Sequence, residues 1–239
     1  MRLSLILGVA LLQAWPAVAG EFFTLKGHGG PVMGIAVSDT DQIATVSFDN
    51  AVGLWSGNDP TWLDGHEAAV NAVLFGPDGT IYSAGDDFTI REWASDGSQT
   101  AVWTGHKGKI MSLALSSDGR FLASASWDGS IGLWSRDDGS VTFLKGHSGP
   151  VNDVAFAQGS DQLYSASADG SIRAWSVIGA KETQRVVEHG FGVNEIEINE
   201  NAGWLAYGAV DGAKRSLQPA RGGGWRGLHH GGEHHRLAR

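Results

Sequence analysis

Short apolar segments and clusters of turn residues alternate along most of this chain. Each unit of the pattern starts with an apolar run, and a second strand of small residues follows a tight turn such as Pro77-Asp78-Gly79. A third strand ends in tryptophan and a fourth leads to the next unit. Short apolar runs bounded by turn residues predict β-strands. The pattern therefore predicts four antiparallel strands about every forty residues.

Polar residues recur at fixed places in the same units. A Gly-His pair opens each unit, with the histidines at His28, His66, His106 and His147. An Asp followed six residues later by Trp closes it, at Asp49/Trp55, Asp87/Trp93, Asp128/Trp134 and Asp169/Trp175. A hydroxyl stands four residues before each Asp, at Thr45, Ser83, Ser124 and Ser165. The steps between histidines are 38, 40 and 41 residues, which indicates a repeat architecture.

These residues resemble the WD40 repeat family over roughly residues 22–212. The resemblance implies an all-β propeller, with full blades at about 26–63, 64–103, 104–144 and 145–187 and a partial fifth at 188–213. The family has Asp after each Trp, whereas this chain has Ser56, Ala94, Ser135 and Ser176.

The resemblance also implies that His, hydroxyl, Asp and Trp form a hydrogen-bonded network inside each blade. Buried donors and acceptors need partners, and a satisfied network fixes the arrangement of loop and turn. A His/Ser/Asp catalytic triad is the alternative, but four equivalent triads in one chain are implausible. We therefore expect no enzyme activity, no cofactor, and no metal held by the repeat histidines, since each belongs to a different blade.

The repeat degenerates after residue 188. Residues 193–198 and 204–208 match the first two strands, but Tyr207 takes the hydroxyl position, Leu217 the Trp position, and Lys214 a position otherwise held by Val or Ile. Residues 214–239 are basic and rich in Gly, His and Arg. Three interpretations stay open for them: an out-of-frame peptide, a disordered basic tail, or a tail that binds metal through His229, His230, His234 and His235.

The units also predict an incomplete ring. Residues 22–25 look like a fourth strand that, in this family, completes the last blade, yet the blade it should complete is missing. An open arc exposes strand edges and gives a route for self-association. Closure as a strained five-blade ring is the alternative.

The N-terminal residues and the charge of the chain predict its cellular compartment and argue against nucleic acid as a partner. Residues 1–19 read as a signal peptide, with Arg2, a short apolar run and Ala17-Val18-Ala19 before the cut; an uncleaved anchor is the alternative. This predicts a periplasmic or secreted protein with no membrane span once the signal is removed. The chain has no cysteine, so no disulfide supports it. Residues 20–213 carry 10 Lys+Arg against 25 Asp+Glu, which argues against a nucleic-acid partner.

These features together predict an exported scaffold that binds a protein partner. In the family, the residue before each repeated Asp tends to project from a binding face, and here Phe48, Asp86, Trp127 and Ala168 hold that position. We take Phe48, Asp86 and Trp127 as candidate partner contacts; packing between blades, or a simply solvated Asp86, is the alternative. The wording of the repeats also resembles exported bacterial fusions of a WD40 propeller with a c-type cytochrome, which implies an electron-transfer alternative whose haem domain is missing here.

Overall fold

The computed structural model describes residues 24–157, 159, 161–188, 190–199, 204–212, 214–220 and 224–227. The predicted signal peptide, residues 22–23 and the four tail histidines lie outside this part of the chain. The described residues form strands, turns and loops, with no helix that could cross a membrane.

Twenty strands form five antiparallel sheets of four, which we call blades 1 to 5. Blades 1 and 2 consist of β1 (Val32–Val37), β2 (Ile43–Ser47), β3 (Val52–Ser56), β4 (Asp59–Leu63), β5 (Val70–Phe75), β6 (Ile81–Gly85), β7 (Ile90–Trp93) and β8 (Gln99–Trp103). Blades 3 and 4 consist of β9 (Ile110–Leu115), β10 (Phe121–Ser126), β11 (Ser130–Ser135), β12 (Val141–Lys145), β13 (Val151–Phe156), β14 (Gln162–Ser167), β15 (Ser171–Ser176) and β16 (Lys181–Glu188). Blade 5 consists of β17 (Val193–Asn199), β18 (Trp204–Ala209), β19 (Lys214–Ala220) and β20 (Gly224–Gly227).

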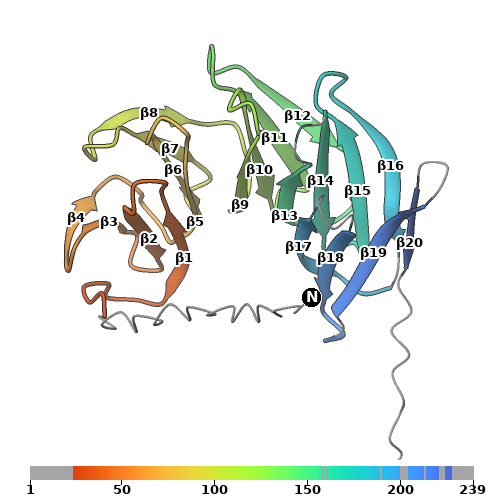
Figure 1. Cartoon of the computed structure of the whole chain (residues 1–239), viewed down its shortest axis with the longest axis horizontal. Helices are drawn as coiled ribbons and strands as arrows, with labels where there is room; N and C mark the ends of the chain where they lie inside the picture. Colours follow the sequence, from red (N-terminus) through yellow and green to blue (C-terminus); the bar gives the residue numbers. More distant parts are fainter. Residues whose placement is uncertain are drawn as a thin grey trace, which may run out of the picture.

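Within every blade the strands pair in sequence order, as a four-stranded meander. The first strand is innermost and contacts the first strand of the next blade, so β1, β5, β9, β13 and β17 follow one another. Figure 1 shows the blades arranged along an arc, with blade 1 and blade 5 at its two ends. The prediction of an all-β propeller with four full blades is confirmed.

The core lies between blades rather than within them. One example is the cluster in which Ala44 and Val46 of blade 1 pack against Val70 and Ile81 of blade 2. Each blade thus offers a face of β-branched and larger residues, which we call its leading face, to the small residues on the trailing face of the blade before it. Repeat architectures are stabilised in this way by contacts between neighbours.

Blade 5 differs from what the sequence predicts for residues 214–239. Residues 214–220 and 224–227 were expected to belong to a tail outside the repeat. Their backbone instead forms β19 and β20, the third and fourth strands of blade 5. The ladder depends on backbone groups rather than on side-chain type, so a strand forms even where Lys214 replaces the usual Val or Ile. Leu217, at the Trp position, is buried and pairs with Leu205.

Candidate functional site

The repeated polar residues meet inside each of the first four blades. In blade 3, the Nε1 of Trp134 donates to the Oγ of Ser124 at 2.8 Å. His106 Nε2 lies 2.8 Å from the same Oγ, and its Nδ1 lies 2.8 Å from Asp128 Oδ2. Because the tryptophan N–H already fills an acceptor position of the hydroxyl, the consistent arrangement has the hydroxyl donating to Nε2 and Nδ1–H donating to the carboxylate. The chain of bonds therefore runs from Trp through Ser and His to Asp.

The same four-residue network is present in blades 1, 2 and 4. The Trp Nε1 to hydroxyl distances are 2.7, 2.8 and 2.8 Å for Trp55–Thr45, Trp93–Ser83 and Trp175–Ser165. The His Nε2 to hydroxyl distances are 2.7, 2.8 and 2.7 Å for His28, His66 and His147. The His Nδ1 to carboxylate distances are 3.0, 2.7 and 2.9 Å for Asp49, Asp87 and Asp169.

Each Asp fastens a loop to a turn. Asp128 accepts hydrogen bonds from the backbone N–H of Lys107, in the loop that enters the blade, and from that of Ser130, in the turn that follows it. Although burial opposes ionisation, these hydrogen bonds and those from Ser130 Oγ and His106 lower the pKa of Asp128 to about 2. Hydrogen bonds lower the pKa of Asp87 to about 2 in the same way, and the bond from His66 has the largest effect. The carboxylates are ionised partners in a structural network at neutral pH.

The geometry of the network rules out a role for its serine hydroxyls as nucleophiles. Ser83, Ser124 and Ser165 are completely buried, and each hydroxyl is already engaged by a tryptophan N–H and an imidazole. A catalytic serine needs an exposed hydroxyl with room for a substrate carbonyl. The network therefore stabilises the blade, as the resemblance implied.

Acid is expected to weaken this network. The pKa of each network Asp is lower in the folded state. Its contribution to stability is therefore present above the unfolded value of 3.8 and is lost as the pH falls through the folded value, which is about 2 for Asp87 and Asp128. Thermal melts between pH 5 and pH 2 should show Tm falling, and Asp128→Asn should make that fall shallower. An identical slope in the variant would contradict the assignment.

A cover over the imidazole in blades 1 and 3 is a feature that the sequence analysis missed. In blades 1 and 3 an aromatic ring of the fourth strand lies edge-on to the histidine: Trp62 is 4.9 Å from His28, and Phe143 is 5.1 Å from His106, between ring centroids. A glycine in the third strand leaves room for this ring in blade 1, because a Cβ at Gly53 would lie 3.1 Å from the Trp62 ring.

In blades 2 and 4 an arginine takes the place of that glycine, and its guanidinium lies beside the network Asp, 4.0 Å away for Arg91 and Asp87 and 3.7 Å away for Arg173 and Asp169. Arg91 donates to Gln99 at 2.6 Å, and Arg173 donates to Glu182 at 2.7 Å. The glycine of the Gly-His pair is explained by both arrangements. A Cβ at Gly105 would lie 2.8 Å from the Phe143 ring, and one at Gly146 would lie 2.8 Å from Nη1 of Arg173.

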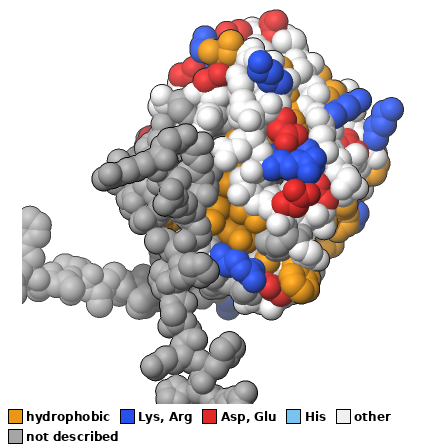
Figure 2. Space-filling view, turned by 90° about the vertical axis from the view of Figure 1, so that its right-hand side faces the viewer, with side chains coloured by type: hydrophobic (Ala, Val, Ile, Leu, Met, Phe, Trp, Pro, Cys, Tyr) orange, Lys and Arg blue, Asp and Glu red, His pale blue; other side chains and the backbone are white. Residues whose placement is uncertain are grey.

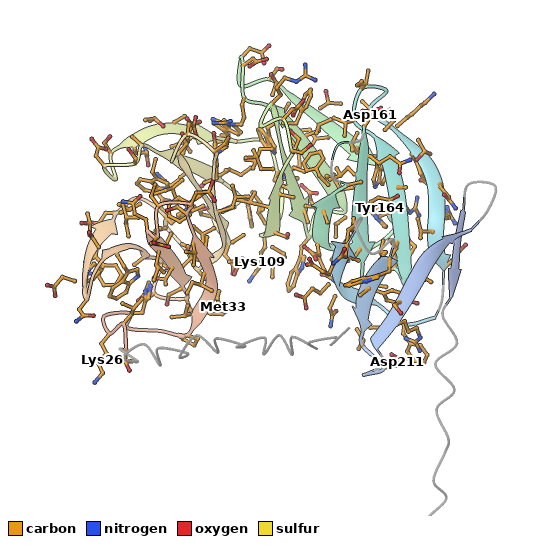
Figure 3. All side chains as sticks on the ribbon, viewed as in Figure 1. Lys26, Met33, Lys109, Asp161, Tyr164 and Asp211 are labelled. Carbon is orange, nitrogen blue, oxygen red and sulfur yellow. The ribbon has the colours of Figure 1, made fainter. Side chains whose placement is uncertain are left out.

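The face that carries the second-to-third-strand turns holds the candidate partner contacts. Phe48 and Trp127 are about half exposed, at 51% and 46%. Trp127 is nevertheless fixed, because its Nε1 donates to Asn152 Oδ1 at 3.1 Å and Lys109 Nζ lies 5.5 Å from its ring centroid. Figure 3 shows Lys109 on the inner side of the arc, between blades 2 and 3. Ala168 is exposed as well.

Asp86 is held by neighbours rather than free in solvent. It accepts a hydrogen bond from Asn71 Nδ2 at 2.8 Å and forms an ion pair with Lys109 of the next blade. The alternative that Asp86 is simply solvated is therefore wrong. Its role here is to link blade 2 to blade 3 beside the Trp127 ring.

Asn71 and Asn152 tie neighbouring blades together at this end of the inner strands. Each stands where a first strand has an irregular register, and each donates to the first carbonyl of the next inner strand: Asn71 to Ile110 at 3.0 Å, and Asn152 to Val193 at 2.9 Å. A β-bulge re-aims a side chain in this manner. These hydrogen bonds fix the inner strands of blades 2 to 5 near Trp127, which itself contacts Asn152.

Acidic and basic side chains are mixed on the side of the molecule shown in Figure 2. There, Lys and Arg side chains lie beside Asp and Glu rather than forming a basic stripe. Among the described residues, Arg185 pairs with Glu188 and Arg215 pairs with Asp211. Within these described ranges, no group of three or more His, Asp or Glu side chains is placed to hold a metal ion.

The comparisons with known proteins agree with this geometry. The family described as WD domain, G-beta repeat matches residues 21–56, 59–94, 97–135 and 139–176, which is more than half of the chain. Each matched segment runs up to the tryptophan strand of one blade. The chain therefore belongs to the WD40 repeat family.

Individual relatives share only part of the chain. Protein HIR1 of Mycosarcoma maydis is 33% identical over 108 residues, which cover 43% of this chain and 10% of that protein. Guanine nucleotide-binding protein subunit beta of Schizosaccharomyces pombe is 45% identical over 59 residues, 24% of this chain and 19% of that protein. Ribosome biogenesis protein YTM1 of Vanderwaltozyma polyspora is 27% identical over 114 residues, 39% of this chain and 25% of that protein. The matches thus span a quarter or less of each of these relatives.

Proposed function

We propose that this chain is an exported scaffold that holds a protein partner on the face formed by the turns before each network Asp. Trp127 is the observation that carries the proposal. Its ring is half exposed, yet two neighbours fix its orientation, so little side-chain entropy is lost when a partner covers it. Tryptophan is among the residues most often responsible for binding energy at protein interfaces.

Two further observations support a scaffold. The repeated cluster of His, hydroxyl, Asp and Trp is saturated inside the blades, so its geometry serves stability. Phe48 occupies the same place in blade 1 as Trp127 does in blade 3, and both project from loops that the buried networks hold in position. The relatives named above include a subunit of a guanine nucleotide-binding protein, which is consistent with protein assembly as the family's use of this fold.

Trp127→Ala is expected to reduce capture of the partner at least tenfold while changing Tm little, because a half-exposed ring contributes modestly to the core. The full chain, its Trp127→Ala variant and an Ile178→Ala control should be used as bait under identical conditions, with captured proteins quantified by mass spectrometry. Ile178 is a suitable control because it is 80% exposed and lies in the turn after β15, at the opposite end of the strands.

Equal capture by all three baits would remove this face from the proposal. A large loss of Tm in Trp127→Ala would instead assign the ring to the core. Loss of capture with both substitutions would point to general surface stickiness.

Export rests on the sequence of residues 1–19, and a cleaved product that starts at residue 20 in intact-mass measurement would support it. We do not extend the proposal to electron transfer. The chain has no cysteine and so carries no C-x-x-C-H for haem attachment, and none of the relatives reported above is named as a cytochrome.

A further inference from the structure

The leading face of blade 1 is apolar and exposed. Val32, Ile35 and Val37 of β1 are 54%, 64% and 62% exposed. Met33, next to them on the same strand, is also exposed, and Figure 3 shows it on β1 at one end of the arc. Large patches of this kind on a folded protein mark a contact surface rather than ordinary surface.

The other four blades show that this face is built for an interface. The residues equivalent to Val32 are fully buried in every one of them: Val70, Ile110, Val151 and Val193. The residues equivalent to Ile35 in blades 4 and 5 are Val154 and Ile196, and both are buried. Blade 1 thus carries a leading face of the same composition as its neighbours, but no blade of the described structure covers it.

The opposite end of the arc does not match this face. Ile196 of β17 packs into the core against blade 4. Side chains alternate along a strand, so Glu195 and Glu197 lie on the opposite, trailing face of blade 5. Both glutamates are exposed. Covering Val32, Ile35 and Val37 with this end would strip water from two carboxylates without offering them a cation. Head-to-tail association and closure of the ring by blade 5 are both disfavoured.

We propose that the exposed face of β1 packs against the same face of a second copy of this chain, giving a dimer with two-fold symmetry. The face complements itself, because neither β1 nor β2 carries a charged residue, so apolar side chains of one copy meet apolar side chains of the other. The apolar side chains of two sheets can interdigitate at a separation of about 10 Å. This interface is independent of the partner face around Trp127.

The oligomeric state of the full chain tests the proposal. Multi-angle light scattering and sedimentation velocity are expected to give a dimer for the wild type and a monomer for Ile35→Asp. Because Ile35 is largely exposed within one copy, the substitution should leave Tm of the monomer nearly unchanged. Ile178→Asp, which places the same charge at another exposed isoleucine, should remain a dimer.

Cross-linking distinguishes this symmetry from other arrangements. The chain has no cysteine, so Ile35→Cys introduces a single thiol near the middle of the face. Mild oxidation should convert this variant to a covalent dimer, while Ile178→Cys should stay monomeric on a non-reducing gel.

Three results would overturn the inference. The first is a wild-type chain that is monomeric at its highest soluble concentration. The second is a dimer that persists in Ile35→Asp. The third is an open-ended series of oligomers that Glu195→Lys disrupts and that Ile35→Cys does not trap as a covalent pair, since this would show head-to-tail contact.

Discussion

Asp128→Ala is expected to lower the free energy of unfolding by about 2–4 kcal/mol, since it strips the acceptor from several donors at once. The carboxylate accepts from His106 Nδ1, from the backbone N–H of Lys107, and from the N–H and Oγ of Ser130 at distances of 2.6–2.9 Å. Its side chain is only 14% exposed, so water replaces these bonds incompletely. The blade would lose the link between its entry loop and its second turn.

Urea unfolding followed by tryptophan fluorescence measures the effect, with Asp118→Ala as the matched control. Asp118 is also a turn carboxylate with a pKa lowered to about 2, by hydrogen bonds from Ser116 and Arg120, but its side chain is about half exposed. Its removal should therefore cost much less. Equal losses in the two variants would show that the network position of Asp128 has no special weight.

The network was predictable from sequence because its members are few, polar and strictly spaced. A buried donor or acceptor needs a partner of the right type, so the histidine, hydroxyl, carboxylate and indole of one unit can satisfy one another in a single way. Tyr207 and Leu217 of blade 5 break the set, and both side chains pack in the core beside Leu205.

The surroundings of the network were not predictable from the same spacing, because two different arrangements alternate. Blades 1 and 3 combine a glycine with an aromatic residue, as in Gly132 with Phe143, and blades 2 and 4 combine an arginine with a polar partner, as in Arg173 with Glu182. The alternation can be recognised in the sequence once it is known: Gly-Leu-Trp ends the third strand in blades 1 and 3, and Arg-Glu-Trp or Arg-Ala-Trp ends it in blades 2 and 4. The two aromatic candidates for partner binding, Phe48 and Trp127, lie in blades 1 and 3, which are the blades with the glycine and the aromatic ring.

The end strands show a different limit of sequence analysis. Lys214 and the glycines around Trp225 argue against a blade by side-chain pattern, yet backbone pairing continues through β19 and β20. Conversely, Val32, Ile35 and Val37 look like core residues in sequence, and their type is right for the core of a longer array. Their exposure follows from position in the arc, which no local pattern contains.

Asp153 links three blades and gives the last large effect. Its Oδ1 accepts from Ser112 Oγ of β9 at 2.6 Å, and its Oδ2 accepts from the backbone N–H of Ile196 of β17 at 2.8 Å. Burial raises the pKa of Asp153 to about 6, and the charge of nearby Glu195 adds to the rise, while the hydrogen bonds oppose it. The carboxyl group thus titrates near neutrality at the junction of blades 3, 4 and 5.

The sign of the pH effect follows from that raised pKa. Asp153 binds its proton more tightly in the folded state, so its contribution to stability is complete below pH 3.8 and is lost as the pH rises through about 6. The loss is about 2–3 kcal/mol, or on the order of 5 °C in Tm. His106 and His147, whose pKa values burial lowers, change stability in the opposite direction, because the unfolded chain binds more protons as the pH falls below 6.5.

Comparing wild type with Asp153→Asn cancels the histidine contribution. An asparagine has the size of the protonated acid and no charge to desolvate. Its Nδ2 replaces an oxygen that accepts from the backbone N–H of Val154 or Ile196, but the cost of that lost hydrogen bond does not vary with pH. Relative to the variant, wild type should therefore lose Tm from about pH 4.5 to about pH 7 and then level off, because the carboxyl group is ionised in both states above that pH. Asp118→Asn should leave the wild-type profile unchanged over that range. A constant difference between wild type and Asp153→Asn across the range would show that Asp153 does not titrate there, and that the junction of the last two blades is insensitive to neutral pH.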